Sequence, residues 1–282
     1  MAVPGGEGMG FSVTFWGVRG TIPCPMASHL GFGGNTSCVE VQAGNQRIII
    51  DAGTGLRMLG RKLLAEGVTG ATLLLSHTHL DHISGFPFFA PAYTKGFNLR
   101  VISGHLAGSP DIESVMARQM ERPLFPVPLR TMGGDLNFLE VPPGHCFKLE
   151  GGVRIHTAAL NHPDGATGYR IEYQGRSMAY VTDTEHVPDH PDRNILNLVD
   201  GVDLLLYDST YTDEEWAQRI GWGHSTWMEA VRIARAAHVK TLGLFHHDPD
   251  HDDATMERIE AAAKAEFKNC FAAREGTTIS LD

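Results

Sequence analysis

Short apolar runs bounded by turn-forming residues recur along both halves of the chain. Runs of five to seven residues, rich in Val, Ile, Leu and Phe, are typical of β-strands that are buried on one or both faces. The runs that predict strands are Phe11–Gly17, Ser37–Ala43, Gln46–Ile50, Ala71–Ser76, Leu99–Ser103, Val153–Ala159, Tyr169–Tyr173, Met178–Thr182, Val202–Tyr207 and Lys240–Phe245.

Other segments have their apolar residues at helical spacing. They predict helices over Leu56–Glu66, Asp111–Gln119, Ser225–Ala237 and Thr255–Lys268. Ser225 is the expected N-cap of the third helix. The segment Arg122–Leu129 holds three prolines, which exclude regular structure there. It lies within residues 104–135, which could form a lid, a pocket wall or a plain surface connection.

Strands and helices alternate in both halves, and the second half repeats the order of the first. This order predicts sheets covered by helices. No low-complexity tract or linker interrupts the 282 residues, so we expect a single domain over residues 11–282. Residues 1–10 are Gly-rich, and we expect them to be disordered.

The composition narrows the function classes. The chain has 23 Lys and Arg against 33 Asp and Glu, a formal net charge of -10, which disfavours general binding to nucleic acid. It has no apolar run long enough to span a membrane and no leader with a basic and then an apolar region. The four cysteines form no C-x-x-C pair, which is typical of reduced thiols. We therefore expect a cytoplasmic protein without membrane contact.

The highest density of residues able to bind metal is in the sequence His77-Thr78-His79-Leu80-Asp81-His82, directly after the apolar run ending at Ser76. On an extended chain His77 and His79 point the same way, and Asp81 and His82 follow as the chain turns. A single histidine would be read as a surface residue. Four side chains able to bind metal within six residues indicate a metal site. Imidazole and carboxylate suit zinc, manganese or iron.

This H-x-H-x-D-H motif resembles that of the metallo-β-lactamase superfamily, and the resemblance extends over nearly the whole chain. Four further segments are similar to the family's other motifs. They are Ile48–Gly53, with Asp51 expected to be structural; Asn161–Pro163 followed by Gly168–Ile171; Tyr180–Thr184; and Leu242–His246. The resemblance implies an α/β fold of four layers, an αββα sandwich of two mixed sheets flanked by helices.

The resemblance also implies two divalent metal ions, with zinc favoured and manganese or iron as alternatives. One ion would be held by His77, His79 and His162, the other by Asp81, His82 and His246, with Asp183 and a water or hydroxide bridging them. His247 competes with His246 for the last position. The alternation of Leu242, Leu244 and His246 favours His246.

The stretch from Gly223-His224-Ser225-Thr226 to His246 is similar to the tRNase Z branch of the superfamily. By that resemblance, His224 is the general acid and Asp208 the carboxylate that orients it, and we count Asp81 with them as catalytic. Tyr207 and Asp208 depart from the histidine and glutamate usual in the branch. Arg19 and Asn35, in Gly-rich turns, could touch an anion or serve only the turns.

The branch includes phosphodiesterases, so we expect hydrolysis of a small or cyclic phosphodiester by a metal-bridging hydroxide. The short span from His162 to Asp183 leaves no room for the arm of tRNA-processing members and is similar to phosphonate-pathway cyclic phosphodiesterases. Nucleic acid is therefore a disfavoured partner. Members of the family commonly form dimers, and the resemblance therefore implies a possible homodimer. Leu80 stands where redox-active members have glutamate, which argues against a reductase.

Three alternatives remain at this point. A lactonase or thioesterase is one, for which Tyr207 and Tyr211 would supply the tyrosine. The others are an RNA nuclease and a metal-binding sensor without turnover.

Overall fold

The computed structural model of the chain describes residues 10–106 and 111–282. The predicted disordered N-terminus, residues 1–10, lies outside the described residues except for Gly10. None of the helices in the described part is long and apolar enough to cross a membrane.

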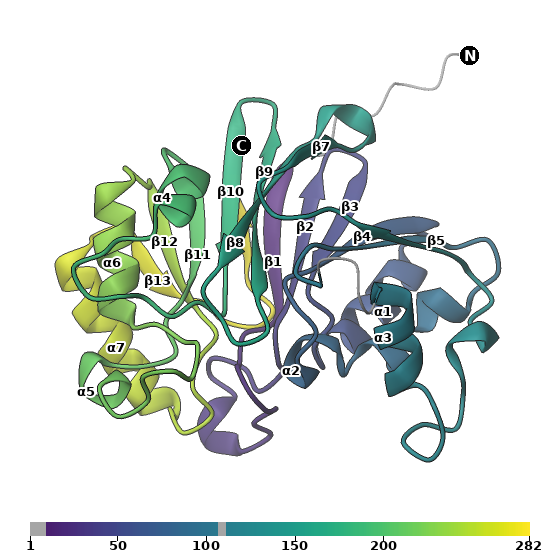
Figure 1. Ribbon diagram of the computed structural model, residues 1–282, viewed down its shortest axis with the longest axis horizontal. Helices are drawn as coiled ribbons and strands as arrows, with labels where there is room; N and C mark the ends of the chain where they lie inside the picture. Colours follow the sequence, from purple (N-terminus) through teal and green to yellow (C-terminus); the bar gives the residue numbers. More distant parts are fainter. Residues whose placement is uncertain (1–9, 107–110) are drawn as a thin grey trace.

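Two seven-stranded sheets lie side by side at the centre of the molecule (Figure 1). The first has the order β14 (Thr278–Ser280), β1 (Phe11–Gly17), β2 (Cys38–Ala43), β3 (Gln46–Ile50), β4 (Gly70–Leu75), β5 (Asn98–Ser103) and β6 (Asp135–Glu140). The second has the order β13 (Cys270–Ala272), β12 (Thr241–Phe245), β11 (Leu204–Asp208), β10 (Arg176–Val181), β9 (Ala166–Tyr173), β8 (Arg154–Leu160) and β7 (Cys146–Lys148).

The two sheets share one pattern of strand directions. In the first, strands β3 to β6 are parallel and the strands before them antiparallel. In the second, strands β10 to β13 are parallel and β7 to β10 antiparallel. The predicted mixed sheets and the loose duplication of the two halves are therefore both present.

Helices cover the outer face of each sheet (Figure 1). On the first sheet lie α1 (Leu56–Ala65) and α3 (Ile112–Gln119), and the one-turn α2 (Leu80–Ile83) follows the end of β4 at the lower edge of the molecule. On the second lie α4 (Arg193–Val199), α6 (Trp227–Ala236) and α7 (Asp253–Glu266), with the short α5 (Asp213–Trp216) in a connection. The predicted αββα arrangement is confirmed.

Burial on both faces explains the continuous apolar strands. In β4, Leu74 packs in the core between the sheets, while Leu73 and Leu75 pack against α1 and its neighbours. In β11, Leu206 faces the core between the sheets and Leu205 the core beneath α6. Such strands show no alternation of apolar and polar residues.

Two helices begin at residues other than those predicted from the sequence. Helix α6 is capped by Thr226, whose Oγ1 accepts a hydrogen bond from the Glu229 N–H at 3.1 Å. Ser225 is therefore wrong as the N-cap; its Oγ lies 2.9 Å from Nδ1 of His186. Helix α7 begins at Asp253, before the predicted Thr255. Arg122–Leu129 contains no strand or α-helix, as its prolines predict.

Candidate metal centre

The chemistry gathers where parallel strands end. Asp51 directly follows β3, and His246 directly follows β12. His77 and Asp183 come two residues after β4 and β10, and Asp208 is the last residue of β11. The carboxyl ends of parallel strands meet at one edge of a sheet, where open α/β sheets bind their ligands.

Sharp backbone turns aim three of these side chains. Asp51, Asp183 and His246 have φ angles of 61°, 55° and 62°. This left-handed region is uncommon for residues other than glycine, although Asp, Asn and His enter it more readily than most. Each such residue costs about 1–3 kcal/mol, and such residues cluster at functional sites.

His77, His79 and His162 form the first donor cluster, with one nitrogen of each lying within 4.8 Å of the others. Nε2 of His162 is 3.1 Å from Nδ1 of His79. Nε2 of His77 is buried and has no hydrogen-bond partner among the residues that the structure describes. A buried polar atom left without a partner is unfavourable, and a bound cation would satisfy it.

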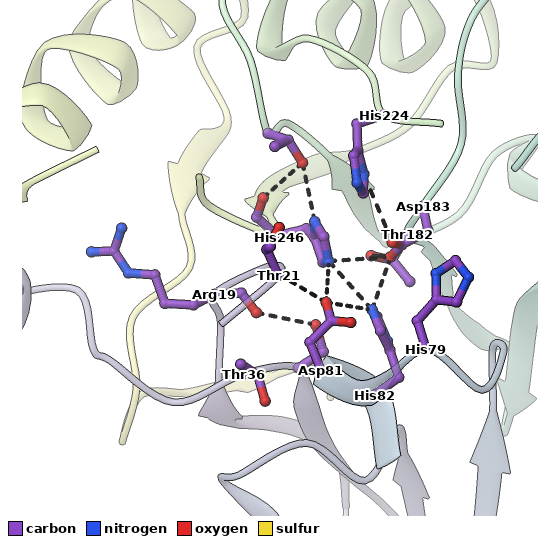
Figure 2. Close-up of polar contacts among 12 residues, drawn as sticks. Arg19, Thr21, Thr36, His79, Asp81, His82, Thr182, Asp183, His224 and His246 are labelled. Carbon is purple, nitrogen blue, oxygen red and sulfur yellow. Dashed lines mark hydrogen bonds and ion pairs between the residues drawn. The ribbon is translucent and has the colours of Figure 1, made fainter. Parts of the chain in front are cut away.

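Asp81, His82, Asp183 and His246 form the second donor cluster (Figure 2). Nε2 of His82 lies 3.2 Å from Oδ2 of Asp81 and of Asp183, and Nε2 of His246 lies 3.3 Å from both oxygens. Ligand atoms about 2.0–2.2 Å from a tetrahedral metal ion are separated by about 3.3–3.6 Å. The spacing of these donors fits one divalent ion.

Asp183 faces both clusters. Its Oδ1 is 3.8 Å from Nε2 of His77 and of His162, while its Oδ2 points to His82 and His246. One carboxylate oxygen is thus turned to each cluster, the arrangement that a bridging ligand requires. The geometry brings together all the residues predicted as metal ligands.

Hydrogen bonds from outside the clusters hold the imidazoles in place. The fully buried carboxylate of Asp51 accepts from Nδ1 of His82 at 2.8 Å, from Ser76 N and Oγ at 2.7 and 2.8 Å, and from the Tyr180 hydroxyl at 2.8 Å. His162 donates from Nδ1 to the carbonyl of Gly223 at 2.8 Å. These contacts leave Nε2 of both rings facing inward, as metal-binding histidines require.

The charge states of the side chains in the two clusters are compatible with a bound cation. Burial lowers the pKa of His77 well below its usual value, so its imidazole is neutral and able to bind metal. Burial opposes the charge of Asp183, but the imidazoles of His246 and His82 hold the pKa of this carboxyl well below its usual value. In the opposite direction to His77, burial alone would lower the pKa of His82, but the charges of Asp81, Asp183 and Asp51 raise it well above its usual value. The centre thus combines a neutral imidazole at His77 with an ionised carboxylate at Asp183.

His224 and Asp208 lie beside the first cluster. Nδ1 of His224 is 3.0 Å from Oδ2 of Asp208. The same nitrogen is 3.7 Å from Oδ1 of Asp183 (Figure 2). The buried Asp208 also accepts from the Thr210 hydroxyl at 2.7 Å and from the N–H groups of Thr210 and Thr184. Burial alone would lower the pKa of His224, but the charges of Asp208 and Asp183 raise it to about 9.

His246 lies in the second cluster and His247 does not. Nε2 of His247 donates to the carbonyl of Ala273 at 2.9 Å, and its ring packs edge-on against Phe32. Burial and the nearby Arg19 lower the pKa of His247 to about 3. The alternation that favours His246 matches this placement.

Arg19 and Asn35 serve turns. The guanidinium of Arg19 is fully buried and donates to the carbonyls of Gly33, Asp248 and His251 at 2.8, 3.1 and 2.6 Å. Asn35 donates from N and Nδ2 to the carboxylate of Glu275. Contact of the Arg19 guanidinium with an anion is therefore wrong, because protein carbonyls surround this group.

Several threonines that the sequence analysis did not single out support the site. The Thr210 hydroxyl lies 3.0 Å from Nδ1 of His246 while donating to Asp208. The Thr182 hydroxyl donates to Oδ2 of Asp183 at 2.7 Å, and the Thr21 N–H donates to Oδ2 of Asp81 at 2.8 Å. Thr182 lies next to Asp183 and Thr210 two residues after Asp208, and this closeness in the sequence is the signal that could have pointed to them.

Comparison with known proteins places this arrangement in a wider group. A family model described as a beta-lactamase superfamily domain matches residues 46–247. Ribonuclease Z of Bradyrhizobium sp. (strain ORS 278) is 28% identical over 306 residues, which cover 91% of this chain and 95% of that protein.

Two solved structures have a similar fold. The metallo-beta-lactamase fold protein YhfI from Bacillus subtilis matches with a TM-score of 0.72 at 20% identity, covering 95% of this chain and 98% of that one. A diphosphatase from the PhnP family also matches with a TM-score of 0.72, at 19% identity, covering 96% of this chain and 98% of that one. At these identities the likeness concerns the fold.

Proposed function

This chain belongs to the beta-lactamase superfamily, and on that basis we propose that it is a metal-dependent hydrolase that cleaves a small or cyclic phosphodiester. The observation that carries the proposal is the pair formed by His224 and Asp208, 3.0 Å apart, beside two adjoining donor clusters. The clusters provide sites for metal ions, and the pair provides a proton donor next to them.

The donor set supports two divalent ions. One ion would be held by His77, His79 and His162, the other by Asp81, His82 and His246, with Asp183 between them. Nitrogen and oxygen donors without cysteine suit zinc first, with manganese or iron as alternatives. Such ions, when bound, lower the pKa of a bound water molecule toward neutral pH and stabilise negative charge on the attacked phosphate.

The chain's own residues then handle the leaving group. Nδ1 of His224 donates to Asp208, so the ring's other nitrogen, Nε2, can carry a proton to the departing oxygen. Asp208 orients the ring and is itself held by Thr210 and Thr184. We assign Asp81 to the catalytic centre through the second cluster, where the Thr21 N–H fixes its Oδ2.

The size of the substrate is inferred from the fold and the charge. Strands β9 and β10 pair directly, from Tyr173 and Arg176 onward, so the chain between His162 and Asp183 holds two strands and a tight turn with no inserted arm. A net charge of -10 adds no general attraction for a polyanion. Both features favour a small substrate.

RNA is the second candidate substrate, because a relative over nearly the whole chain is a ribonuclease Z. A lactonase or thioesterase is less well supported, since Tyr207 and Tyr211 are only 1% and 3% exposed. The complete donor set argues against a sensor without turnover. A cytoplasmic location, a homodimer and a single domain over residues 11–282 stay predictions from the sequence.

Hydrolysis of bis(p-nitrophenyl) phosphate by the protein loaded with zinc or manganese tests the function, with His79→Ala as a variant that loses one donor. Turnover that requires metal and is lost in His79→Ala is expected. Cyclic nucleotides and a structured RNA then separate the two substrate classes. Two bound ions with no turnover of any phosphodiester would overturn the proposal.

His224→Asn tests the proton donor. We expect kcat to fall by about 10²–10⁴-fold for a substrate with an alkoxide leaving group, because that group must be protonated as it departs. The loss should be much smaller with p-nitrophenolate, which leaves without a proton. His145→Asn, at an exposed histidine near β7, is the matched control. Equal losses with both leaving groups would contradict a role as general acid.

A further inference from the structure

The turn over residues 219–223, here called the Trp222 turn, leads from α5 to His224. Gly221 and Gly223, on either side of Trp222, have φ angles of 89° and 84°, which side chains rarely allow. A Cβ on Gly223 would lie 2.3 Å from Nδ1 of His162. The backbone of the turn is thus packed directly against a predicted metal ligand.

Glu185, in the segment after β10, forms hydrogen bonds to the backbone of this turn. Its carboxylate accepts from the N–H of Gly221 at 2.8 and 2.9 Å and from the N–H of Gly223 at 2.8 Å. Its backbone N–H donates to the carbonyl of Asn161 at 2.7 Å, and its own carbonyl accepts from Nδ2 of Asn161 at 2.8 Å. Hydrogen bonds to an ionised carboxylate are the stronger kind.

These hydrogen bonds connect the turn to the segments that carry the predicted ligands Asp183 and His162. Glu185 stands two residues after Asp183, and Asn161 directly precedes His162. The carbonyl of Gly223 in turn accepts from His162. The carboxylate of Glu185 is therefore the common support of the turn and of this side of the metal centre.

The first residue of the turn is tied to the proton donor. The Arg219 guanidinium lies 4.9 Å from the ring centre of Tyr211, and the Tyr211 ring meets the His224 ring edge-on at 5.9 Å. The Trp222 N–H donates to the carbonyl of Arg219 at 3.1 Å. Both ends of the turn are thereby held in a defined place relative to His224.

This rigid turn presents an exposed aromatic side chain. Trp222 is 61% exposed, and its ring has no aromatic partner among the described residues. An exposed indole contributes little to folding, so the supports around it are not explained by core packing. Trp222 stands two residues from His224, and consecutive Cα atoms are about 3.8 Å apart. The Cα of Trp222 therefore lies no more than about 7.6 Å from that of the predicted proton donor.

We propose that Trp222 is a stacking platform for a planar base on the leaving-group side of the scissile phosphate, and that Glu185 is the positioning residue that holds it there. The inference rests on the proposed phosphodiesterase function and narrows its substrate to the nucleotide type, a base joined through a sugar to the phosphodiester. Aromatic side chains stack on every base through its π-face, without regard to its sequence identity.

A matched pair of substrates tests the platform in the metal-loaded, full-length protein. Adenosine 2′,3′-cyclic phosphate carries a base on its leaving group, and the 2,3-cyclic phosphate of methyl riboside lacks one. We expect Trp222→Ala to reduce the preference in kcat/KM for the base-bearing substrate by about tenfold. Trp222→Phe should keep most of the preference, and Ile220→Ala, a 62% exposed neighbour in the same turn, should keep all of it.

Glu185→Ala and Glu185→Gln test the positioning role. The alanine variant should raise KM for the base-bearing substrate and also lower kcat, because the turn that leads to His224 loses its support. The glutamine variant keeps an acceptor oxygen and should restore part of both. Unchanged KM and kcat in Glu185→Ala would overturn this role.

Two failures can be told apart. If the wild type cleaves both substrates and Trp222→Ala keeps the full preference, the platform is wrong while the phosphodiesterase function stands. If the metal-loaded wild type cleaves neither of these substrates nor bis(p-nitrophenyl) phosphate, the phosphodiesterase function is wrong. In that case calorimetric binding of adenosine 2′,3′-cyclic phosphate, compared between wild type and Trp222→Ala, still measures stacking, and equal affinities would reject it.

Discussion

At the residue scale, the centre works by fixing the outer nitrogen of its imidazoles. His82 is held by Asp51, His162 by the carbonyl of Gly223, and His246 by Thr210. Each contact engages Nδ1 and turns Nε2 toward the neighbouring carboxylates. His79 is different, since its Nδ1 faces His162 and 43% of its side chain is exposed. It is the donor most open to solvent.

Asp51→Asn should weaken metal binding. The amide removes a charge that stabilises the His82 N–H and leaves four donors around a poorer acceptor, so the metal affinity should fall by about 10–100-fold. Competition with a chelator, followed by metal analysis, measures the change. Asp203→Asn, another largely buried carboxylate paired with Arg176 and Lys240 away from the centre, is the control. An affinity equal to that of the wild type would show that Asp51 does not support His82.

At the element scale, parallel strands and the turns after them do most of the positioning. Each of β3, β4, β10, β11 and β12 ends at the same edge and delivers at least one polar side chain there. Most residues of these strands are apolar and buried, and a site built on packed strands is held more precisely than one on loops.

Another element contact is electrostatic. Helix α7 is joined to the segment after β13 through Glu260, whose carboxylate accepts from Arg274 at 2.7 and 3.2 Å, from Lys264 at 2.9 Å and from the N–H of Ala272 at 3.2 Å. Burial alone would raise the pKa of Glu260, but these hydrogen bonds lower it to about 2. The folded state therefore binds this proton less readily than the unfolded chain does.

Glu260→Gln should change the acid sensitivity of the fold. Since the folded pKa lies below the unfolded value of 4.5, the stabilisation is fully present above pH 4.5 and is lost as pH falls toward 2. We expect the wild type to exceed the variant by about 1–2 kcal/mol at pH 7, after allowance for solvent screening. Thermal unfolding at several pH values should show this gap closing in acid, with Glu257→Gln, at an exposed site on the same helix, as control. A gap independent of pH would contradict the assignment.

At the scale of the whole molecule, the centre lies between two halves of similar design. His77, His79, Asp81 and His82 follow β4 of the first sheet, while His162, Asp183 and His246 follow β8, β10 and β12 of the second. Bound ions would join the sheets at this edge, in addition to the apolar core between them.

Removal of metal should therefore destabilise the entire fold. A ligand at about 1,000 times its Kd stabilises the folded state by about 4 kcal/mol, which for a chain of this size corresponds to a Tm change on the order of 10 °C. Melting curves with a chelator, and again after zinc is restored, measure the effect. The effect should shrink in His79→Ala, and a Tm insensitive to the chelator would argue against ions that join the two sheets.

The sequence by itself determined the layered architecture and the position along the chain of the residues predicted to bind metal. Strands buried on both faces read as continuous apolar runs, so β4 and β11 are recognisable without a partner. His77, His79, Asp81 and His82 are contiguous, and the alternation before His246 distinguishes it from His247. Short elements such as β7, β13, β14, α2 and α5 are too brief to show a period, which is why no pattern predicts them.

Only the tertiary structure decided how residues distant in the sequence pair. The Ser225 hydroxyl contacts His186, 39 residues away in the sequence, while Thr226 caps α6. Arg19 lies among carbonyls more than 200 residues away, at Asp248 and His251. Glu185 and Gly223 are likewise neighbours only in the fold. A single sequence records local periodicity, whereas these contacts arise from the packing of separate strand ends against one another.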